Sequence, residues 1–359
     1  MRTALCCALL CWAAGLAAAQ EREVTFEAPK PVTVSGFAVG QFAWDREQAA
    51  NSALASKLAL SLFRPWSDNL YLFGQLTTHV EEGDSGTTTT EIEVDNLIVS
   101  WTPSGLSALN VSFGRFDAPL GFERDDEPLN LIPTNSFNFE LARPAKLTGL
   151  VARYTLSPRV STALIAANGW GAEIDNNSGK TGGLRLEVLP SEGVAVGVTG
   201  LYGPEDAATN ANPRTLVTGD LTVQRGAHLI VGAEVNRGRQ RAGGGGAVAT
   251  WTGGAVTAFW RLGRSTGLSV RGEVLDDPDG FTTGTPQTLR SLTISPWYFY
   301  REAQEGIFSA IEHTSFRLPA FALRPAVRFD NSTAAFFEDH TGGFKRTHVS
   351  AVVELVYLF

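Results

Sequence analysis

Charged side chains gather in one long segment, residues 117–144, with the sequence DAPLGFERDDEPLNLIPTNSFNFELARP. Six acidic residues stand against Arg124 and Arg143, so the segment carries a net charge of −4. A connection of this length with enough apolar residues to pack on a surface is usually functional. Such residues can select ions in an aqueous passage, where the acidity favours cations, or can brace the segment by ion pairs. The acidic residues are Asp117, Glu123, Asp125, Asp126, Glu127 and Glu140.

Signatures of catalysis and of metal binding do not stand out elsewhere in the chain. The five histidines show no HExxH spacing, and there is no GxSxG nucleophile motif. Residues 276–280 (DDPDG) lack the distal Glu of an EF-hand loop, and Gly243–Gly246 precedes no helical pattern. The net charge of −8 opposes nucleic-acid binding. We therefore expect no enzyme activity, no catalytic residue, no cofactor, no metal and no nucleic-acid partner.

The first nineteen residues have the organisation of an export signal. Arg2 precedes an apolar stretch, and Ala17–Ala19 fits a cleavage site for small residues. All three cysteines lie inside this segment, so a mature chain beginning near Gln20 would have no disulfide or thiolate site. The alternative is a lipid anchor on Cys11, which the bulky Leu10 before it disfavours. We expect residues 1–19 to be a signal peptide and 20–30 a short periplasmic lead-in.

Apolar and polar residues alternate with a period of two along the rest of the chain, which indicates strands with one greasy face. After the signal, no run reaches 18 consecutive apolar residues, so a membrane protein of this sequence must cross with strands rather than helices. The last run ends on the aromatic Phe359, as transmembrane barrel strands often do. Its apolar column is Val349, Ala351, Val353, Leu355, Tyr357 and Phe359.

Connections between these runs are short and long in turn, which is typical of a bacterial outer-membrane barrel. We predict an all-β fold, a transmembrane antiparallel β-barrel of about 16 strands over residues 31–359, with short periplasmic turns and long extracellular loops. Residues 289–317 are long enough for two strands where parity allows one, so 14 or 18 strands remain open. A soluble β-sandwich or β-helix is the alternative, but it does not explain the rhythm of the connections.

A barrel of about 16 strands encloses an aqueous lumen, whereas eight strands would be filled by side chains. We expect the segment 117–144 to fold into this lumen and to narrow it. The alternation also places a balanced set of charges on the inner wall, either selecting ions or pairing across strands. This set is Lys57, Arg185, Arg271, Arg324 and Arg328 with Glu187, Asp220, Glu234, Glu273 and Glu354.

Aromatic residues near the ends of the strands predict two interfacial girdles. One lies beside the short turns and the other toward the long loops. The first group is Trp66, Trp101, Tyr154, Trp260, Tyr357 and Phe359, and the second is Trp44, Trp170, Tyr202 and Trp251.

Residues 110–188 resemble the OmpL-like family of outer-membrane β-barrel porins in the order and spacing of several motifs. Phosphate-selective porins of the O/P type share a similar start of the long loop and are the nearest rival. The resembling pieces are GRFDAPLGFE from Gly114, ARP from Ala142, LTGLVARY from Leu147, ANGW from Ala167, NNSGKTGG from Asn176 and RFDNS from Arg328.

The resemblance implies a porin in the outer membrane of a Gram-negative cell, which lets small polar solutes or ions diffuse through its lumen. Outer-membrane lipid would surround it, and a homo-oligomer such as a trimer is left open. A barrel-embedded hydrolase and a surface adhesin or structural barrel are the alternative functions. The residues expected at the pore lining or constriction are Arg115, Asp117, Glu123, Asp125, Asp126, Arg153, Lys180, Arg185, Glu187, Arg271, Glu273, Arg324 and Arg328. Asn168 also matches a polar motif position.

Overall fold

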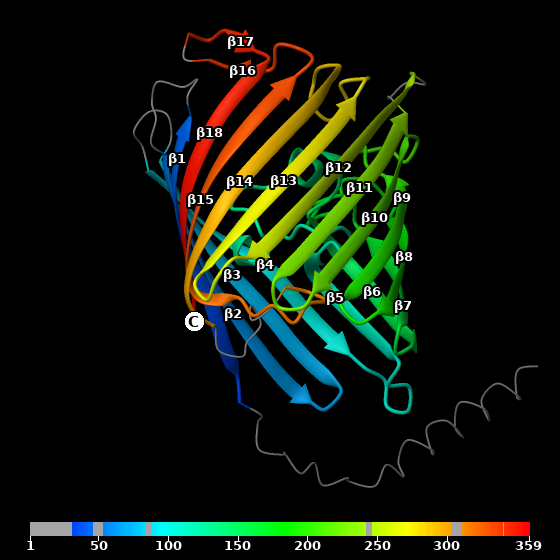
Figure 1. Ribbon diagram of the computed structural model, residues 1–359. Helices are drawn as coiled ribbons and strands as arrows, with labels where there is room; N and C mark the ends of the chain where they lie inside the picture. Colours follow the sequence, from blue (N-terminus) through cyan, green and yellow to red (C-terminus); the bar gives the residue numbers. More distant parts are fainter. Residues whose placement is uncertain (1–30, 46–52, 83–87, 242–245, 303–310, 340) are drawn as a thin grey trace, which may run out of the picture. The chain divides into compact units, whose positions relative to one another are not determined.

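The computed structural model describes residues 31–45, 53–82, 88–241, 246–302, 311–339 and 341–359. The proposed signal peptide and lead-in, residues 1–30, lie outside the described residues. Every strand belongs to one compact unit, Val32–Phe359. Its sixteen long strands form a closed antiparallel barrel in which each strand pairs with its sequence neighbours (Figure 1). The predicted fold class is therefore confirmed.

The strands follow the predicted alternation and span most of the chain. They are β1 (Thr33–Asp45), β2 (Ala53–Ser67), β3 (Leu70–Glu82), β4 (Thr88–Trp101), β5 (Leu109–Asp117), β6 (Lys146–Ser157), β7 (Val160–Ala167) and β8 (Thr181–Ser191). The second half holds β9 (Val194–Pro204), β10 (Pro213–Arg225), β11 (Leu229–Arg241), β12 (Val248–Arg261), β13 (Thr266–Asp277), β14 (Gln287–Glu302), β15 (Pro319–Ser332) and β18 (Thr347–Leu358). A small hairpin, β16 (Phe337–Glu338) and β17 (Phe344–Lys345), forms a separate sheet.

The barrel buries polar side chains and exposes apolar ones, the reverse of a water-soluble protein. On β10, Val217 is 51% exposed while its neighbour Thr218 is fully buried. On β11, Val235 is 53% exposed and Asn236 is fully buried. Because successive side chains of a strand point to opposite faces, the outer face is apolar and the inner face carries polar side chains together with buried apolar clusters. This pattern suits a barrel surrounded by lipid.

Residues 289–317 contain one barrel strand rather than two. The single long strand β14 takes up the first part, pairing with β13 on one side and β15 on the other. The second part, from Ile311, has no barrel strand among its described residues. The count is therefore 16, and the alternatives of 14 and 18 are wrong. The connection from β14 to β15 lies at the same end as the short turns and breaks their pattern.

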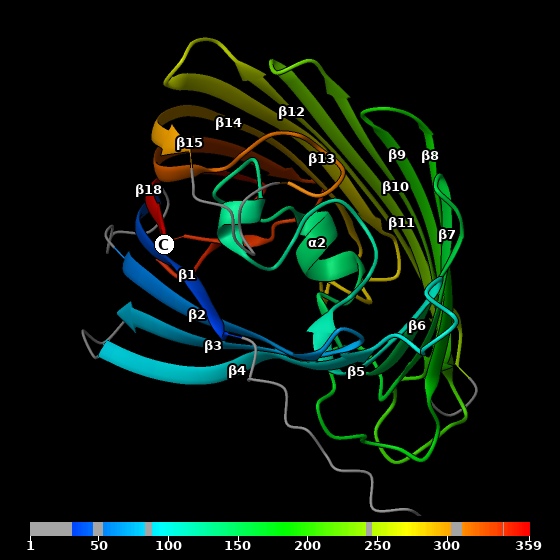
Figure 2. The ribbon, with the colours of Figure 1, turned by 90° about the horizontal axis from the view of Figure 1, so that it is seen from below.

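The long connection between β5 and β6, residues 118–145, lies inside the ring of strands (Figure 2). It contains the 3-10 turn η1 (Glu127–Leu129) and the short helix α2 (Phe137–Ala142). The backbone amide of Phe139 donates to Ser136 Oγ over 3.0 Å and so caps the start of α2. We call residues 118–145 the inner loop.

Two aromatics assigned to the interfacial girdles lie elsewhere. Trp251 is 1% exposed and faces inward, where its Nε1 donates to Ala142 O of the inner loop over 2.9 Å. Trp170 packs edge-on against Trp251. On the same strand β12, Trp260 lies at an odd spacing from Trp251 and is 41% exposed on the outer face. Proximity to a strand end therefore did not determine which face an aromatic occupies.

Candidate functional site

Three inward-facing arginines hold the inner loop by its backbone. Arg271 on β13 donates to Asn135 O over 3.0 Å and to the Glu123 carboxylate over 2.7 Å. Arg324 on β15 donates to Glu127 O over 3.0 Å, and Arg328 donates to Asn135 O over 2.7 Å. A loop with little regular structure has unpaired carbonyls, and guanidinium groups can satisfy several of them at once. These arginines therefore anchor the loop to the wall.

Two inward-facing carboxylates hold the loop by its amide groups. Glu234 Oε2 on β11 accepts from the amide of Phe122 over 2.6 Å, and its Oε1 lies 2.6 Å from Arg143 Nε. Glu273 Oε2 on β13 accepts from the amide of Phe137, also over 2.6 Å. These bonds hold the loop near its start, at Phe122, and near its end, at Phe137 and Arg143. The loop is therefore fixed against β11–β15.

An acidic cluster ties the loop to the opposite strands. Lys146 Nζ lies 2.9 Å from Asp95, 2.7 Å from Asp117 and 3.2 Å from Asp125. Gln75 donates to Asp126 over 2.8 Å. Burial, together with the nearby Asp117, raises the pKa of the Asp126 carboxyl well above its ordinary value. Further bonds join Lys57 to Glu127, Gln41 to the carbonyl of Pro133 and Trp297 to the carbonyl of Leu131.

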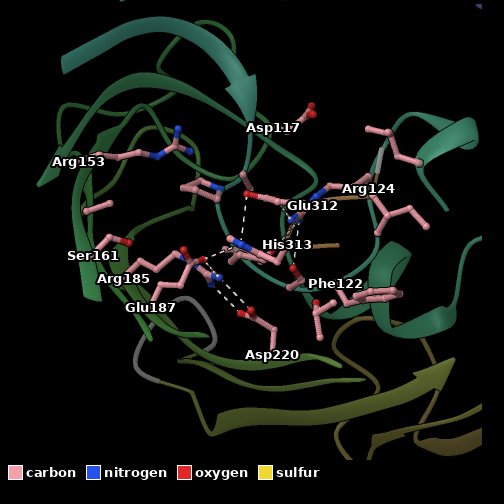
Figure 3. A pocket seen from close by; sticks show the side chains of 18 of the residues that line it. Asp117, Phe122, Arg124, Arg153, Ser161, Arg185, Glu187, Asp220, Glu312 and His313 are labelled. Carbon is pink, nitrogen blue, oxygen red and sulfur yellow. Dashed lines mark hydrogen bonds and ion pairs between the residues drawn. The ribbon is translucent and has the colours of Figure 1, made fainter. Parts of the chain in front are cut away.

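A cavity of about 550 Å³ remains beside the loop, against β6, β7, β8 and β10 (Figure 3). We call it the open side of the lumen. Arg185 on β8 reaches Asp220 on β10 with two bonds, of 2.6 and 2.9 Å, and Glu187 with a third, of 3.0 Å. Asp117 at the end of β5 and Arg124 of the inner loop also line this cavity.

The connection between β14 and β15 completes the lining. Its described part begins at Ile311, and Ile311, Glu312 and His313 all reach the cavity. Glu312 forms an ion pair with Arg124, and His313 Nε2 lies 3.2 Å from Glu187 Oε2. The hydrogen bond to Glu187 raises the pKa of His313, and the charge of Arg124 lowers the pKa of Glu312. Both groups therefore favour their charged forms in this cavity.

The residues expected at the pore fall into three sets. Four line the open side: Asp117, Arg153, Arg185 and Glu187. Seven hold the inner loop: Glu123, Asp125, Asp126, Arg271, Glu273, Arg324 and Arg328. Two are in neither set: Arg115 pairs with Glu93 and Glu173, and Lys180 pairs with Asp175 and bonds Asn168 in the loop after β7.

Sequence reasoning missed the contribution of Glu312 and His313, because the strand pattern left residues 289–317 unassigned. The only signal was the excess length of residues 289–317. It also missed Arg143 and Lys146, whose polar bonds to the wall depend on how the loop is folded. Their charges were visible in the sequence, but their partners were not.

Among the described residues, no group of three or more His, Cys, Asp or Glu side chains is arranged to hold a metal ion. The helices of the described part are too short, and not apolar enough, to cross a membrane.

Comparisons with known proteins agree with this architecture. OmpT of Vibrio cholerae in a trimer form is 10% identical, with 92% of this chain and 99% of that chain aligned at a TM-score of 0.61. An anion-selective porin from Comamonas acidovorans is 10% identical over 92% and 99%, at 0.62. OprB of Pseudomonas putida is 12% identical over 91% and 94%, at 0.61. At these identities the likeness establishes the fold alone. No curated protein matches the sequence.

A protein-family model described as "Putative beta-barrel porin-2, OmpL-like" matches residues 69–359, which is most of the chain. The matched range includes the inner loop, the open side of the lumen and the last strand. Membership of this family agrees with the closed barrel, its apolar outer face and its polar lumen. The chain is an outer-membrane β-barrel that belongs to the OmpL-like porin family.

Proposed function

We propose that small hydrophilic solutes and ions diffuse passively through the open side of the lumen, and that the inner loop sets the width of this passage. The observation that carries the proposal is the asymmetric placement of the loop. Its polar bonds attach it to β1–β3 and β11–β15, whereas on the side of β6–β10 it has apolar contacts through Ala118 and Leu120 at its start. The cavity of about 550 Å³ remains on that second side. A solute would therefore pass between the loop and strands β6–β10.

The lining suits transit rather than catalysis, and we infer no enzyme activity. Ser161 and His313 both line the cavity, but among the described residues no hydrogen bond joins them. His313 Nε2 instead faces Glu187. A nucleophile needs a base within hydrogen-bond reach, so the hydrolase alternative has no geometric support here. The adhesin alternative does not account for a charged cavity inside the barrel.

Planar-bilayer recordings test the proposal directly. Asp117 and Lys146 are register partners on adjacent strands, so a short Gly-Ser turn can replace residues 118–145 and keep the pairing of β5 with β6. We expect the purified protein to conduct, and we expect the shortened variant to conduct more, because the passage is wider. The matched control replaces residues 174–179 of the loop after β7 with Gly and Ser, and its conductance should equal that of the wild type.

Absence of conductance in the wild type would overturn the proposed function. Equal conductance with and without the inner loop would show that the loop does not set the width. The same recordings test assembly: we infer a trimer, since a similarly folded barrel is described in a trimer form, and closure should then occur in three equal steps.

A further inference from the structure

Arg153 occupies a distinctive position on the open side of the lumen. It lies on β6, in register with Ala163 on β7, which is in turn in register with Arg185 on β8. The small side chain of Ala163 leaves Arg153 exposed to the cavity. In Figure 3 dashed lines join the other labelled arginines to carboxylates, and none reaches Arg153. Among the described residues it has no hydrogen-bond or ion-pair partner.

Each of the other charged side chains that line the cavity has a partner of opposite charge. Arg124 pairs with Glu312, and Asp117 pairs with Lys146. Arg185 is shared by two carboxylates, as described above, and one of these, Glu187, also faces His313. Every carboxylate of the lining therefore has a cationic partner or a partly charged imidazole beside it. Arg153 is the one arginine of the described lining without such a partner.

A glycine on β9 gives Arg185 room to reach Asp220. A Cβ at Gly197 would lie 2.3 Å from Arg185 Nη2 and 2.4 Å from Asp220 Oδ1. The glycine therefore leaves the space through which the Arg185 guanidinium crosses β9 to Asp220. Both terminal nitrogens of Arg185 therefore already donate to carboxylates, and its charge is shared with Asp220 and Glu187.

We propose that Arg153 is the residue that gives this pore a preference for anions; the inference rests on the proposed function. A close ion pair acts on a distant solute as a dipole, whereas an unpaired charge acts with its full field at short range. An arginine stays protonated at every physiological pH. Its forked donors also match carboxylate and phosphate groups. The acidic inner loop does not reverse the preference, because none of its carboxylates lines this cavity: the exposed Glu140 lies outside the lining, and the other four are bonded elsewhere.

The range of the effect sets the kind of solute that responds to it. The field of an exposed charge is screened over about 10 Å at 0.1 M salt and about 3 Å at 1 M. Only an ion that passes through the cavity itself comes close enough to Arg153 at high salt. Small anions such as chloride, and small carboxylates, are the class that fits this geometry.

Reversal potentials in a KCl gradient across a planar bilayer test the proposal. We expect the wild type to favour chloride, and more strongly at 0.1 M than at 1 M. Arg153→Gln should remove most of the preference, and Arg153→Glu should turn it toward potassium. The matched control is Arg239→Gln on β11, an exposed arginine on the outer face outside the cavity lining, which changes the net charge equally. Its reversal potential should match the wild type.

The outcomes separate this inference from the proposed function. A protein that does not conduct contradicts the porin function itself. A conducting protein that favours potassium, or whose reversal potential is the same in Arg153→Gln as in the wild type, contradicts only the role of Arg153. Equal unfolding of all variants in urea confirms that the barrel is intact in each.

Discussion

Glu234 shows how one inward-facing carboxylate can fix a long segment of chain. Besides the amide of Phe122 and the guanidinium of Arg143, it accepts a bond from Asn236 over 2.7 Å. Gly121, with a φ of +76°, lies against it, and a Cβ there would be 2.2 Å from Glu234 Oε2. Only glycine adopts this conformation readily and leaves room for the carboxylate. The start of the inner loop is therefore shaped around this side chain.

Replacing Glu234 should be costly because it leaves a buried charge without its partner. The side chain of Arg143 is 1% exposed, so Glu234→Ala would leave its guanidinium without its carboxylate. We expect a loss of about 3–5 kcal/mol in the free energy of unfolding, measured by urea titration in lipid vesicles. Glu234→Gln keeps the shape and one acceptor, so it should cost less. Wild-type stability in the alanine variant would contradict this role for Glu234.

At the scale of elements, the connection from β14 to β15 behaves as part of the wall. Ser315 and Gln224 exchange two hydrogen bonds, of 2.7 and 2.8 Å. Phe316 packs edge-on against Phe259 with ring centroids 5.0 Å apart. The described residues 311–318 are thus docked on the barrel by polar and apolar contacts together. The charged contacts near their start include the only titratable imidazole in the cavity lining.

Docking of this segment should weaken as the pH rises. The pKa of His313 is raised from its model-peptide value of about 6.5. The ion pair with Glu187 is therefore complete below about pH 6.5 and is lost as the pH rises through the higher folded-state pKa. The other charged groups around it are Glu312, Arg124, Arg185 and two residues near the short turn between β8 and β9, Arg159 and Glu192.

We expect open-channel current noise to increase between pH 6 and pH 9 in the wild type, because the docked segment is held less firmly. His313→Gln cannot form the ion pair, so its noise should be high and independent of pH. Planar-bilayer recordings at both pH values measure the effect. A pH dependence that persists unchanged in His313→Gln would rule out His313 as its origin.

At the scale of the whole molecule, closure of the barrel depends on the seam between β1 and β18. The backbones of Gly36 and Phe359 exchange two hydrogen bonds, of 2.9 and 3.0 Å. A Cβ at Gly36 would lie 2.3 Å from Ala59 O and 2.8 Å from the ring of Phe359. This seam joins the two ends of the described chain, and no other pairing can replace it.

Gly36→Ala should therefore weaken closure, with a cost of about 1–3 kcal/mol for overpacking. Gly40→Ala on the same strand is the matched control, because a Cβ there meets nothing within 4 Å. The folded fraction on unheated electrophoresis gels and the urea midpoint measure the difference. Equal stability of the two variants would show that the seam tolerates the added methyl group.

Much of the barrel could be predicted because lipid and water impose a strict alternation on each strand. The same alternation implies that Trp251 and Trp260 face opposite sides of the barrel, because their spacing on β12 is odd. We assigned both to girdles from their positions near strand ends and therefore missed this difference. A bulge, by contrast, defeats alternation. The register shifts between Gln75 and Leu76, so that Asp95 and Asn96, adjacent on β4, are both buried. The local sequence of β3 and β4 contains no pattern that predicts this register shift.

The candidate site was less predictable, because charge type is local whereas pairing is not. Arg185 and Arg153 look equivalent in sequence, both inward-facing, on two strands separated by β7. Their difference arises from Asp220, two strands away from Arg185, and from the absence of any such partner for Arg153. The length of the inner loop was evident, but the wall to which it is bonded depends on contacts across the lumen.

The one-sided attachment of the inner loop has a consequence for divergence among related pores. Strands that bond the loop must keep their partners, because each loss leaves a buried polar group unsatisfied. Strands β6–β8 and β10 instead face the open cavity, where several inner positions carry only small side chains such as Ala163. Substitutions there can change which solutes permeate, with little loss in the stability of the folded barrel. The same few positions offer an engineer a way to tune permeation while leaving the scaffold alone.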